Sequence, residues 1–229
     1  MSRHIQQRLD FLPPEQPHYG NWVRHLSAEA ACNRMAMWLV HGGSLWLTSE
    51  QVSGKSHFLQ AISLEHPFLG VVRPDSGLSA LKQVDRWCDQ LERFASWAVD
   101  MPAGSENVAS GFALFHLIER AKQKNRPLLI CWRCTNEDLQ PPELASRMRV
   151  LEQVNMPVPE DDLTLGRILR STALTWHWEI PDGVLEVMLT YLPRDLATLL
   201  DALRQLEAAS FEEQKRITKS WVKKHLDLG

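Results

Sequence analysis

The chain has 229 residues, 44% of them hydrophobic, which is enough to bury one sizeable core and a smaller second one. Its net charge of −3 argues against sequence-independent DNA binding, because neutralising phosphates requires a surplus of Lys and Arg, so we expect a protein partner and little direct DNA binding. No apolar run approaches the ~18 residues of a membrane-spanning helix, and the first residues lack a signal-peptide core, so we expect a cytoplasmic protein with no membrane partner.

The first 20 residues are rich in Pro and Gln and are predicted to form an extended segment ahead of the folded part. Gln7 is followed there by the apolar Leu9 and Phe11. Two interpretations stay open. The apolar side chains either pack against the folded body, or they anchor a short docking peptide in a pocket of a partner.

The first predicted helix leads into an apolar strand. Ser27 is a suitable N-cap for a helix that extends to about Val40, and Gly42-Gly43 follow as a stop signal. The alternating apolar stretch Ser44–Thr48 then predicts a strand. After a short polar loop, an amphipathic helix begins at about Lys55.

The loop between this strand and helix ends in Gly54-Lys55-Ser56, which is typical of a phosphate-binding loop. Backbone N–H groups at the helix N-terminus would face phosphate oxygens, Lys55 would reach the outer phosphates, and the Ser56 hydroxyl would bind magnesium. The alternative is an ordinary helix start, because this tripeptide recurs by chance. We therefore predict that nucleotide is contacted by Ser53, Gly54, Lys55, Ser56 and His57.

Two residues of the loop depart from the full motif. Ser49 stands where an intact loop has a glycine, whose missing Cβ helps the chain turn back over the phosphates. Glu50 adds a negative charge near the phosphate position. We therefore expect weaker nucleotide binding than an intact loop supports.

Strands and helices alternate through the next part of the chain, which predicts a parallel sheet covered on both faces and thus an α/β fold with an αβα domain. Functional sites in such sheets lie at the carboxyl ends of the strands, where we expect Lys55, Ser56, Asp100 and Arg133 to gather. The predicted elements are strand 68–72, helix 78–94, strand 97–100, helix 110–124, strand 127–131 and helix 141–149.

Asp100 ends one of these strands, where phosphate-loop proteins hold magnesium beside the Ser of the loop. Ser56 and Asp100 are therefore the predicted metal ligands, and the alternative is that Asp100 merely terminates its strand. Hydrolysing proteins usually have a second acid next to this Asp, whereas Met101-Pro102 follow here. Intrinsic hydrolysis should be poor.

The cysteines lie at positions 32, 88, 131 and 134, and the last two form a C-x-x-C pair. Such a pair invites a redox or zinc interpretation. Zinc would need two more ligands at matching spacing, and none pair up nearby. We expect Cys131 and Cys134 to be two reduced thiols without a metal.

The pattern after about Met156–Pro159, which we interpret as a linker, is helical only. The predicted helices cover about 161–175, 181–192 and 195–209, with a last one from 220. We therefore divide the chain into an N-terminal tail (1–20), an αβα nucleotide-binding domain (21–156) and a helical domain (157–229).

The chain resembles the Hda family of regulatory inactivators of the bacterial replication initiator DnaA, a DnaA-related branch of the AAA+ proteins. The order and spacing of several segments carry the resemblance more than any single motif. These segments are Gly54–Ala61, Leu114–Ile118, Leu144–Met148, Leu206–Ser210 and Ile217–Leu226. The resemblance implies an AAA+ αβα domain with an all-helical lid, and a DNA replication inhibitor rather than a stand-alone enzyme.

The resemblance also implies partners and site residues. Members of the family dock on the DNA polymerase III sliding clamp through an N-terminal Gln-Leu motif, whose place Gln7, Leu9 and Phe11 take here with altered spacing. They present an arginine finger to ATP bound on DnaA, and Arg147 falls on the Arg of that motif. A finger can supply about 10³ to 10⁵ in rate. Without the resemblance, Arg147 would be interpreted as a surface ion pair.

Two further positions differ from the family. Arg133 stands where the family has a small polar sensor, and Ala197 takes the place of the sensor arginine of the lid. Arg194, one helical turn earlier, is a candidate substitute in nucleotide binding. We expect an adenine nucleotide, ADP rather than ATP, held weakly or not at all, with Mg²⁺ if it is bound.

Two alternatives to the regulator remain. One is a self-acting AAA+ ATPase, a loader or remodeller that uses Lys55, Ser56 and Asp100. The other is an adaptor that binds no nucleotide and keeps the fold for protein contacts. Homo-oligomer formation stays open in each case.

Overall fold

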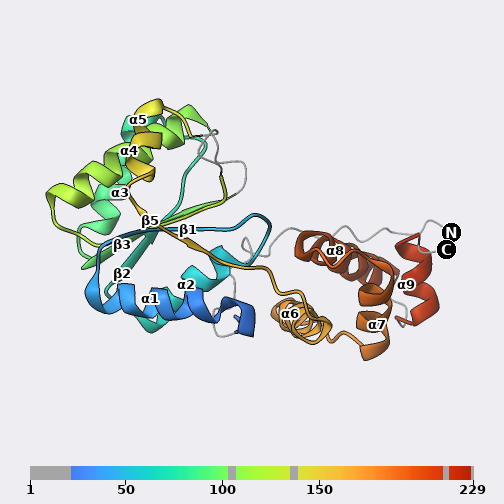
Figure 1. Ribbon diagram of the computed structural model, residues 1–229. Helices are drawn as coiled ribbons and strands as arrows, with labels where there is room; N and C mark the ends of the chain where they lie inside the picture. The colour runs from blue at the N-terminus through green and yellow to red at the C-terminus, as the bar shows by residue number, and fades with distance from the viewer. Residues whose placement is uncertain (1–21, 103–106, 135–138, 214–216, 228–229) are drawn as a thin grey trace.

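The computed structural model describes residues 22–102, 107–134, 139–213 and 217–227, which form an αβα layer followed by a group of helices (Figure 1). The predicted tail residues Gln7, Leu9 and Phe11 lie outside the described residues. Both the parallel sheet with helices on its two faces and the helical group after it confirm the predicted fold class.

Within the described residues the sheet has five parallel strands, in the order β2-β3-β4-β1-β5. Its central strands are buried on both faces, which explains why they are apolar runs with little alternation. All five carboxyl ends lie at one edge of the sheet, so residues that follow different strands are brought together there. The strands are β1 (Ser44–Thr48), β2 (Leu69–Val72), β3 (Ser96–Met101), β4 (Leu128–Trp132) and β5 (Glu152–Asn155).

The edge strand β5 was not predicted, because its sequence Glu-Gln-Val-Asn has no apolar pattern and three of its four residues are exposed. Pairing with β1 stabilises it, with Leu45 opposite Glu152 and Thr48 opposite Asn155. The Arg34 side chain also forms an ion pair with Glu152. Tertiary contacts, rather than its own side chains, therefore make this segment a strand.

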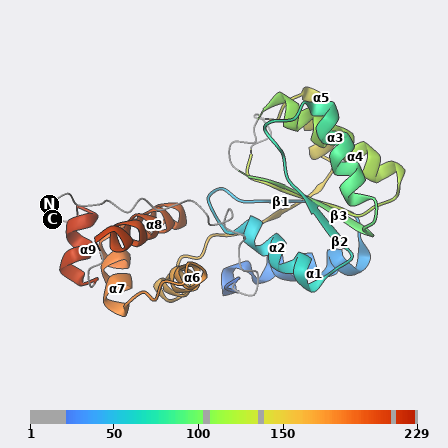
Figure 2. The same ribbon diagram turned by 180° about the vertical axis from the view of Figure 1, so that it is seen from behind.

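Helices α1 (Glu29–His41) and α2 (Lys55–Glu65) cover one face of the sheet (Figures 1 and 2). Helices α3 (Ala80–Leu91), α4 (Val108–Gln123) and α5 (Pro142–Met148) cover the other face. A separate hydrophobic core lies on each side of the sheet. Large side chains fill these cores, and the fully buried tryptophans are Trp38, Trp87, Trp97 and Trp132.

The prediction that Ser27 caps the first helix was wrong. Residues Leu26–Ala28 form a 3₁₀ turn, η2, and α1 begins after it at Glu29. The Ser27 hydroxyl lies 2.7 Å from Nδ1 of His25 instead of bonding to the helix N-terminus.

The remaining helices are α6 (Asp162–Thr175), α7 (Asp182–Tyr191), α8 (Leu196–Glu213) and α9 (Lys219–His225). They enclose a hydrophobic core of their own. Side chains that accept hydrogen bonds from backbone N–H groups cap three of them, Asp161 at α6, Asp195 at α8 and Thr218 at α9. Among the described residues, no helix is both long and apolar enough to cross a membrane.

Candidate functional site

The polar loop after β1 leads directly into α2, as predicted. Gly54 has φ +77°, a left-handed conformation that favours glycine, and its carbonyl accepts the first helical hydrogen bond from Phe58 N–H at 2.9 Å. The N–H groups of the first turn of α2 are therefore presented at the positive end of the helix dipole. Such a helix start is suited to bind the oxygens of an anion.

Ser49 does not have the backbone conformation that would require a glycine. Among the described residues, positive φ at non-glycine positions is confined to Asn125, His177 and Asp227. The Ser49 hydroxyl donates to the carbonyl of Gln51 at 2.6 Å and accepts a hydrogen bond from the Lys55 ammonium. The serine therefore holds Lys55 against the loop.

Burial lowers the pKa of Lys55, and the nearby Arg133 guanidinium lowers it further, while the Asp100 carboxylate opposes the shift. Arg133 follows β4, so the predicted gathering of charged residues at this edge of the sheet is present. Cys131 lies within β4, and burial raises the pKa of its thiol well above the ordinary range. This thiol is protonated at neutral pH.

The C-x-x-C pair forms no disulfide. Cys131 is buried and Cys134 is half-buried. Within the part of the chain that the structure describes, no group of three or more His, Cys, Asp or Glu side chains is placed to hold a metal ion. The described residues thus offer no zinc site.

The two predicted metal ligands are in contact, since the Ser56 hydroxyl donates to Oδ1 of Asp100 at 2.7 Å. The second carboxylate oxygen is engaged by Arg73, whose Nε and Nη2 lie 2.9 and 2.7 Å from Oδ2. The Asp100 side chain is 2% exposed and that of Arg73 is 44% exposed. No local pattern in the sequence marks Arg73, because only the pairing of β2 with β3 brings it beside Asp100.

A small, open cleft with a cavity volume of about 40 Å³ lies between the start of α2 and the helical group. Trp22 forms part of its wall, with its ring 4.7 Å from that of Phe58 and its Nε1 close to Gly54. The buried Ser53 hydroxyl, also in the wall, has no hydrogen-bond partner among the described residues. The lining residues are Trp22, Val23, His25, Ser53, Gly54, His57, Ile168, Thr172 and Leu196.

His25 in this cleft is buried, and burial lowers the pKa of its imidazole, while the carboxylate of Asp161 opposes the shift. The ring is therefore held in the neutral form across a wider pH range than an exposed histidine. Asp161 also caps α6, so the electrostatics of the cleft depend on both the αβα layer and the helical group.

Three of the predicted nucleotide residues, Ser53, Gly54 and His57, line this cleft. Lys55 and Ser56 lie beside it at the strand ends. The other lining residues were not predicted, because they come from the segment before α1 and from α6 and α8, and no local motif marks them.

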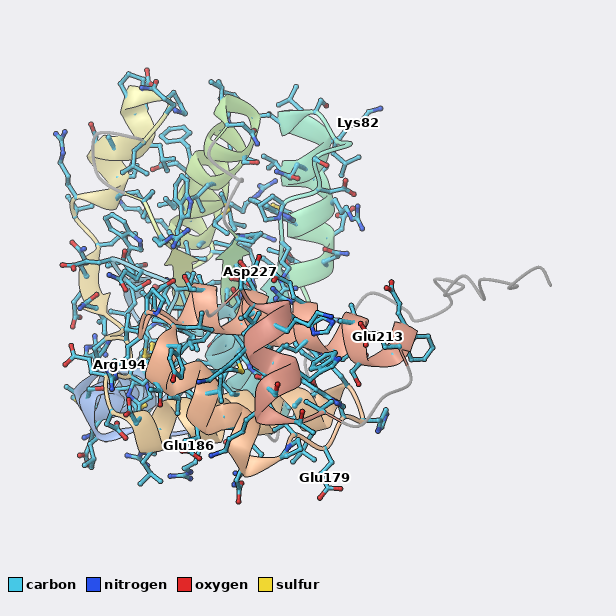
Figure 3. All side chains as sticks on the ribbon, turned by 90° about the vertical axis from the view of Figure 1, so that its right-hand side faces the viewer. Lys82, Glu179, Glu186, Arg194, Glu213 and Asp227 are labelled. Carbon is cyan, nitrogen blue, oxygen red and sulfur yellow. The ribbon has the colours of Figure 1, made fainter. Side chains whose placement is uncertain are left out.

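Arg194 does not line the cleft. Its Nε and Nη2 lie 2.6 and 3.0 Å from the two carboxylate oxygens of Asp162, and it is exposed at the edge of the helical group (Figure 3). The predicted nucleotide contact of Arg194 would require this ion pair to break.

Arg147 lies on α5, on the opposite face of the sheet from α2 (Figure 1). Its side chain is 45% exposed, Nε donates to Oε1 of Glu119 at 2.5 Å, and its guanidinium carbon is 5.8 Å from the Phe115 ring centroid. Both partners belong to α4. Arg147 thus forms a surface ion pair that solvent and other molecules can reach.

Comparison with known proteins finds a domain match in the helical group and a similar fold for the whole chain. Residues 162–226 match the family model described as the lid domain of Hda. Domain III of the replication initiation protein DnaA from Thermotoga maritima is similar in structure, with a TM-score of 0.68 and 18% identity over 94% of this chain and 98% of that one.

Two further structures share the fold. DnaA from Aquifex aeolicus bound to AMPPCP has a TM-score of 0.56 and 16% identity, over 90% of this chain and 69% of that one. The RuvB branch migration motor of Thermotoga maritima has a TM-score of 0.54 and 17% identity, over 89% of this chain and 66% of that one. The αβα domain with its helical lid shares the AAA+ fold of these DnaA and RuvB structures, and its residues 162–226 match the Hda lid domain.

Proposed function

We propose that this protein is an Hda-like regulator of bacterial chromosome replication initiation. It binds the sliding clamp and stimulates hydrolysis of ATP bound on DnaA through Arg147, and so inhibits initiation. The observation that carries the proposal is the position of Arg147, exposed on α5 and separated by the whole sheet from the cleft beside α2. A guanidinium in that position is available to another molecule rather than to its own cleft.

The ion pair with Glu119 does not prevent this role. Exposed pairs contribute about 0.2 to 1 kcal/mol, because water solvates both charges when they separate. Arg147 can therefore leave Glu119 at a small cost when a phosphoryl group with developing negative charge is presented to it. The cation–π contact with the Phe115 ring favours orientations of the side chain that keep the guanidinium near α4.

The cleft supports an adenine nucleotide as a structural ligand, ADP rather than ATP. The unpaired Ser53 hydroxyl, the N-terminus of α2 and Lys55 are the groups that would hold it, and DnaA relatives have been solved with AMPPCP bound. A nucleotide in this cleft would tie the phosphate loop to the lid, since both line it. Met101, where a catalytic acid would be needed, is buried, which supports a ligand that is not hydrolysed.

A magnesium ion does not fit the residues beside Ser56 as they stand. It would have to displace Arg73 from Oδ2 of Asp100. The proposed role uses the nucleotide to hold the structure together, and this does not require the ion. Clamp binding through Gln7, Leu9 and Phe11 rests on the resemblance to the family, since these residues lie outside the described ones.

The proposal is tested by measuring ATP hydrolysis by DnaA in the presence of DNA-loaded clamp and this protein. We expect Arg147→Ala to lower the stimulation by about 10³ or more, the contribution of an arginine finger. Arg149→Ala, which removes an exposed arginine two residues further along, is the matched control and should keep full stimulation. Equal stimulation by the wild type and Arg147→Ala would refute the proposal.

A nucleotide-free adaptor is the second candidate. The bonds of Lys55 to Ser49 and of Arg73 to Asp100 favour it, because they satisfy charged groups that would otherwise bind a ligand. The two candidates differ in ADP binding. Saturable binding of ADP in a calorimetric titration would exclude the adaptor.

A further inference from the structure

Both carboxylate oxygens of Asp100 have partners within the protein. Its side chain is 2% exposed, so its charge needs partners within the protein. Ser56 donates to one carboxylate oxygen, and Arg73 donates to the other through Nε and forms an ion pair with it through Nη2. The carboxylate is thereby neutralised and hydrogen-bonded without any ion.

Arg73 is held in this place by the core of the domain. Parallel pairing of β2 with β3 sets Val72 opposite Val99, so the residues that follow them, Arg73 and Asp100, lie side by side. The buried Trp87 indole donates to the carbonyl of Arg73 at 2.9 Å and fixes its backbone. The fold of the domain therefore places Arg73 beside Asp100.

A divalent ion fits this arrangement poorly. Mg²⁺ requires near-octahedral coordination at about 2.0 to 2.1 Å and retains several of its waters. Such a hydrated ion needs open space beside the carboxylate, whereas Asp100 is buried and its Oδ2 is covered by the guanidinium. The nearby Arg73, Lys55 and Arg133 would also repel a second cation.

We infer that Arg73 replaces the divalent cation of this site, so that the protein binds a nucleoside diphosphate without magnesium. The inference rests on the proposed nucleotide-binding role of the cleft. A guanidinium has five N–H donors, and those that do not contact Asp100 belong to a side chain that is 44% exposed. These N–H groups provide a fixed positive charge and hydrogen-bond donors for the phosphate oxygens, whose negative charge a divalent ion would otherwise screen.

The test is calorimetric titration of the full-length wild-type protein with ADP, once with saturating Mg²⁺ and once with EDTA. We expect the two dissociation constants to agree within about twofold. We expect Arg73→Ala to bind about tenfold to a hundredfold more weakly in EDTA, the size of a lost charge-assisted contact, and to recover with Mg²⁺ because the ion can then approach Asp100.

Arg86→Ala is the matched control, since it removes a similarly exposed arginine, whose partner is the exposed Asp75, and leaves Asp100 untouched. It should bind ADP as the wild type does in both solutions. If Arg73→Ala does not fold, the wild-type comparison decides by itself. Arg73→Lys, which keeps the charge with a single donor group, should then be intermediate in EDTA.

The outcomes separate this inference from the proposed function. Wild-type binding that is more than about tenfold tighter with Mg²⁺ than with EDTA would overturn the inference and leave the proposed function intact. Absence of saturable ADP binding in both solutions would overturn the inference and favour the nucleotide-free adaptor. The Arg147 assay with DnaA is unaffected by either result, because it does not depend on the ligand of this cleft.

Discussion

Gly111 offers a direct test of how α4 packs against the chain that leads into α5. A Cβ added at Gly111 would lie 1.7 Å from the carbonyl oxygen of Gln140, far below the 3.0 Å that such atoms keep in real structures. Because the obstacle is backbone, it cannot swing aside as a side chain would. Gly111→Ala must therefore displace the segment at Gln140 and the start of α5 at Pro142.

The expected magnitude combines two opposing effects. Overpacking lowers the free energy of unfolding by about 1 to 3 kcal/mol. We expect about 3 kcal/mol for Gly111→Ala, the upper end of this range, because the obstacle is backbone. Replacing glycine by alanine inside a helix stabilises it by about 1 kcal/mol. The net loss of about 2 kcal/mol should lower the thermal midpoint by about 4 to 8 °C in a protein of this size.

Gly166→Ala is the matched control, because Gly166 also lies inside a helix, α6, but its added Cβ would meet only Leu189 Cδ1 at an ordinary 3.7 Å. This variant should gain about 1 kcal/mol and melt about 2 to 4 °C higher. Thermal melts followed by circular dichroism compare the two. A Gly111→Ala protein as stable as Gly166→Ala would show that α4 and the Gln140 segment are not in the described contact.

Glu119→Gln removes the ion-pair partner of Arg147. Since an exposed pair contributes up to about 1 kcal/mol, stimulation of DnaA's ATP hydrolysis should rise by up to about fivefold. A large decrease would instead show that Glu119 orients the arginine. Because burial lowers the pKa of His25, the unfolded chain takes up the proton first, so the free energy of unfolding should fall as the pH drops below about 6.5. Chemical denaturation at several pH values across this range measures this dependence, and His25→Gln should make the free energy of unfolding depend less on pH. Ser53→Ala removes an unpaired buried hydroxyl and should raise the free energy of unfolding by about 1 kcal/mol without nucleotide, while weakening ADP binding; lower stability would mean that the hydroxyl has a partner in solution.

The fold class follows from local patterns that depend on neighbouring residues alone. Apolar runs at 44–48 and 97–100, separated by helical periodicity, predict the central strands because these are buried on both faces. The phosphate loop is equally local, since Gly54 supplies the left-handed turn immediately before α2. These predictions therefore agree closely with the structure.

The edge of the sheet and the start of α1 were less predictable. β5 is polar and becomes a strand only because β1 is available to pair with it. Ser27 has the chemistry of an N-cap, but its hydroxyl lies against His25, a contact that the sequence does not reveal. In both places a nonlocal or competing hydrogen bond decides the outcome.

The sequence by itself determined which charged residues lie at the ends of the strands, because the length of a strand and the polar residues that follow it can be recognised from consecutive positions. Strand order, which sequence does not encode locally, decided that Arg73 meets Asp100. Packing of the lid against the αβα layer likewise decided that Trp22 and Ser53 share a cleft with Ile168. The physical reason is that hydrogen bonds between strands and burial between layers join residues far apart in the chain, whereas periodicity and capping report only on near neighbours.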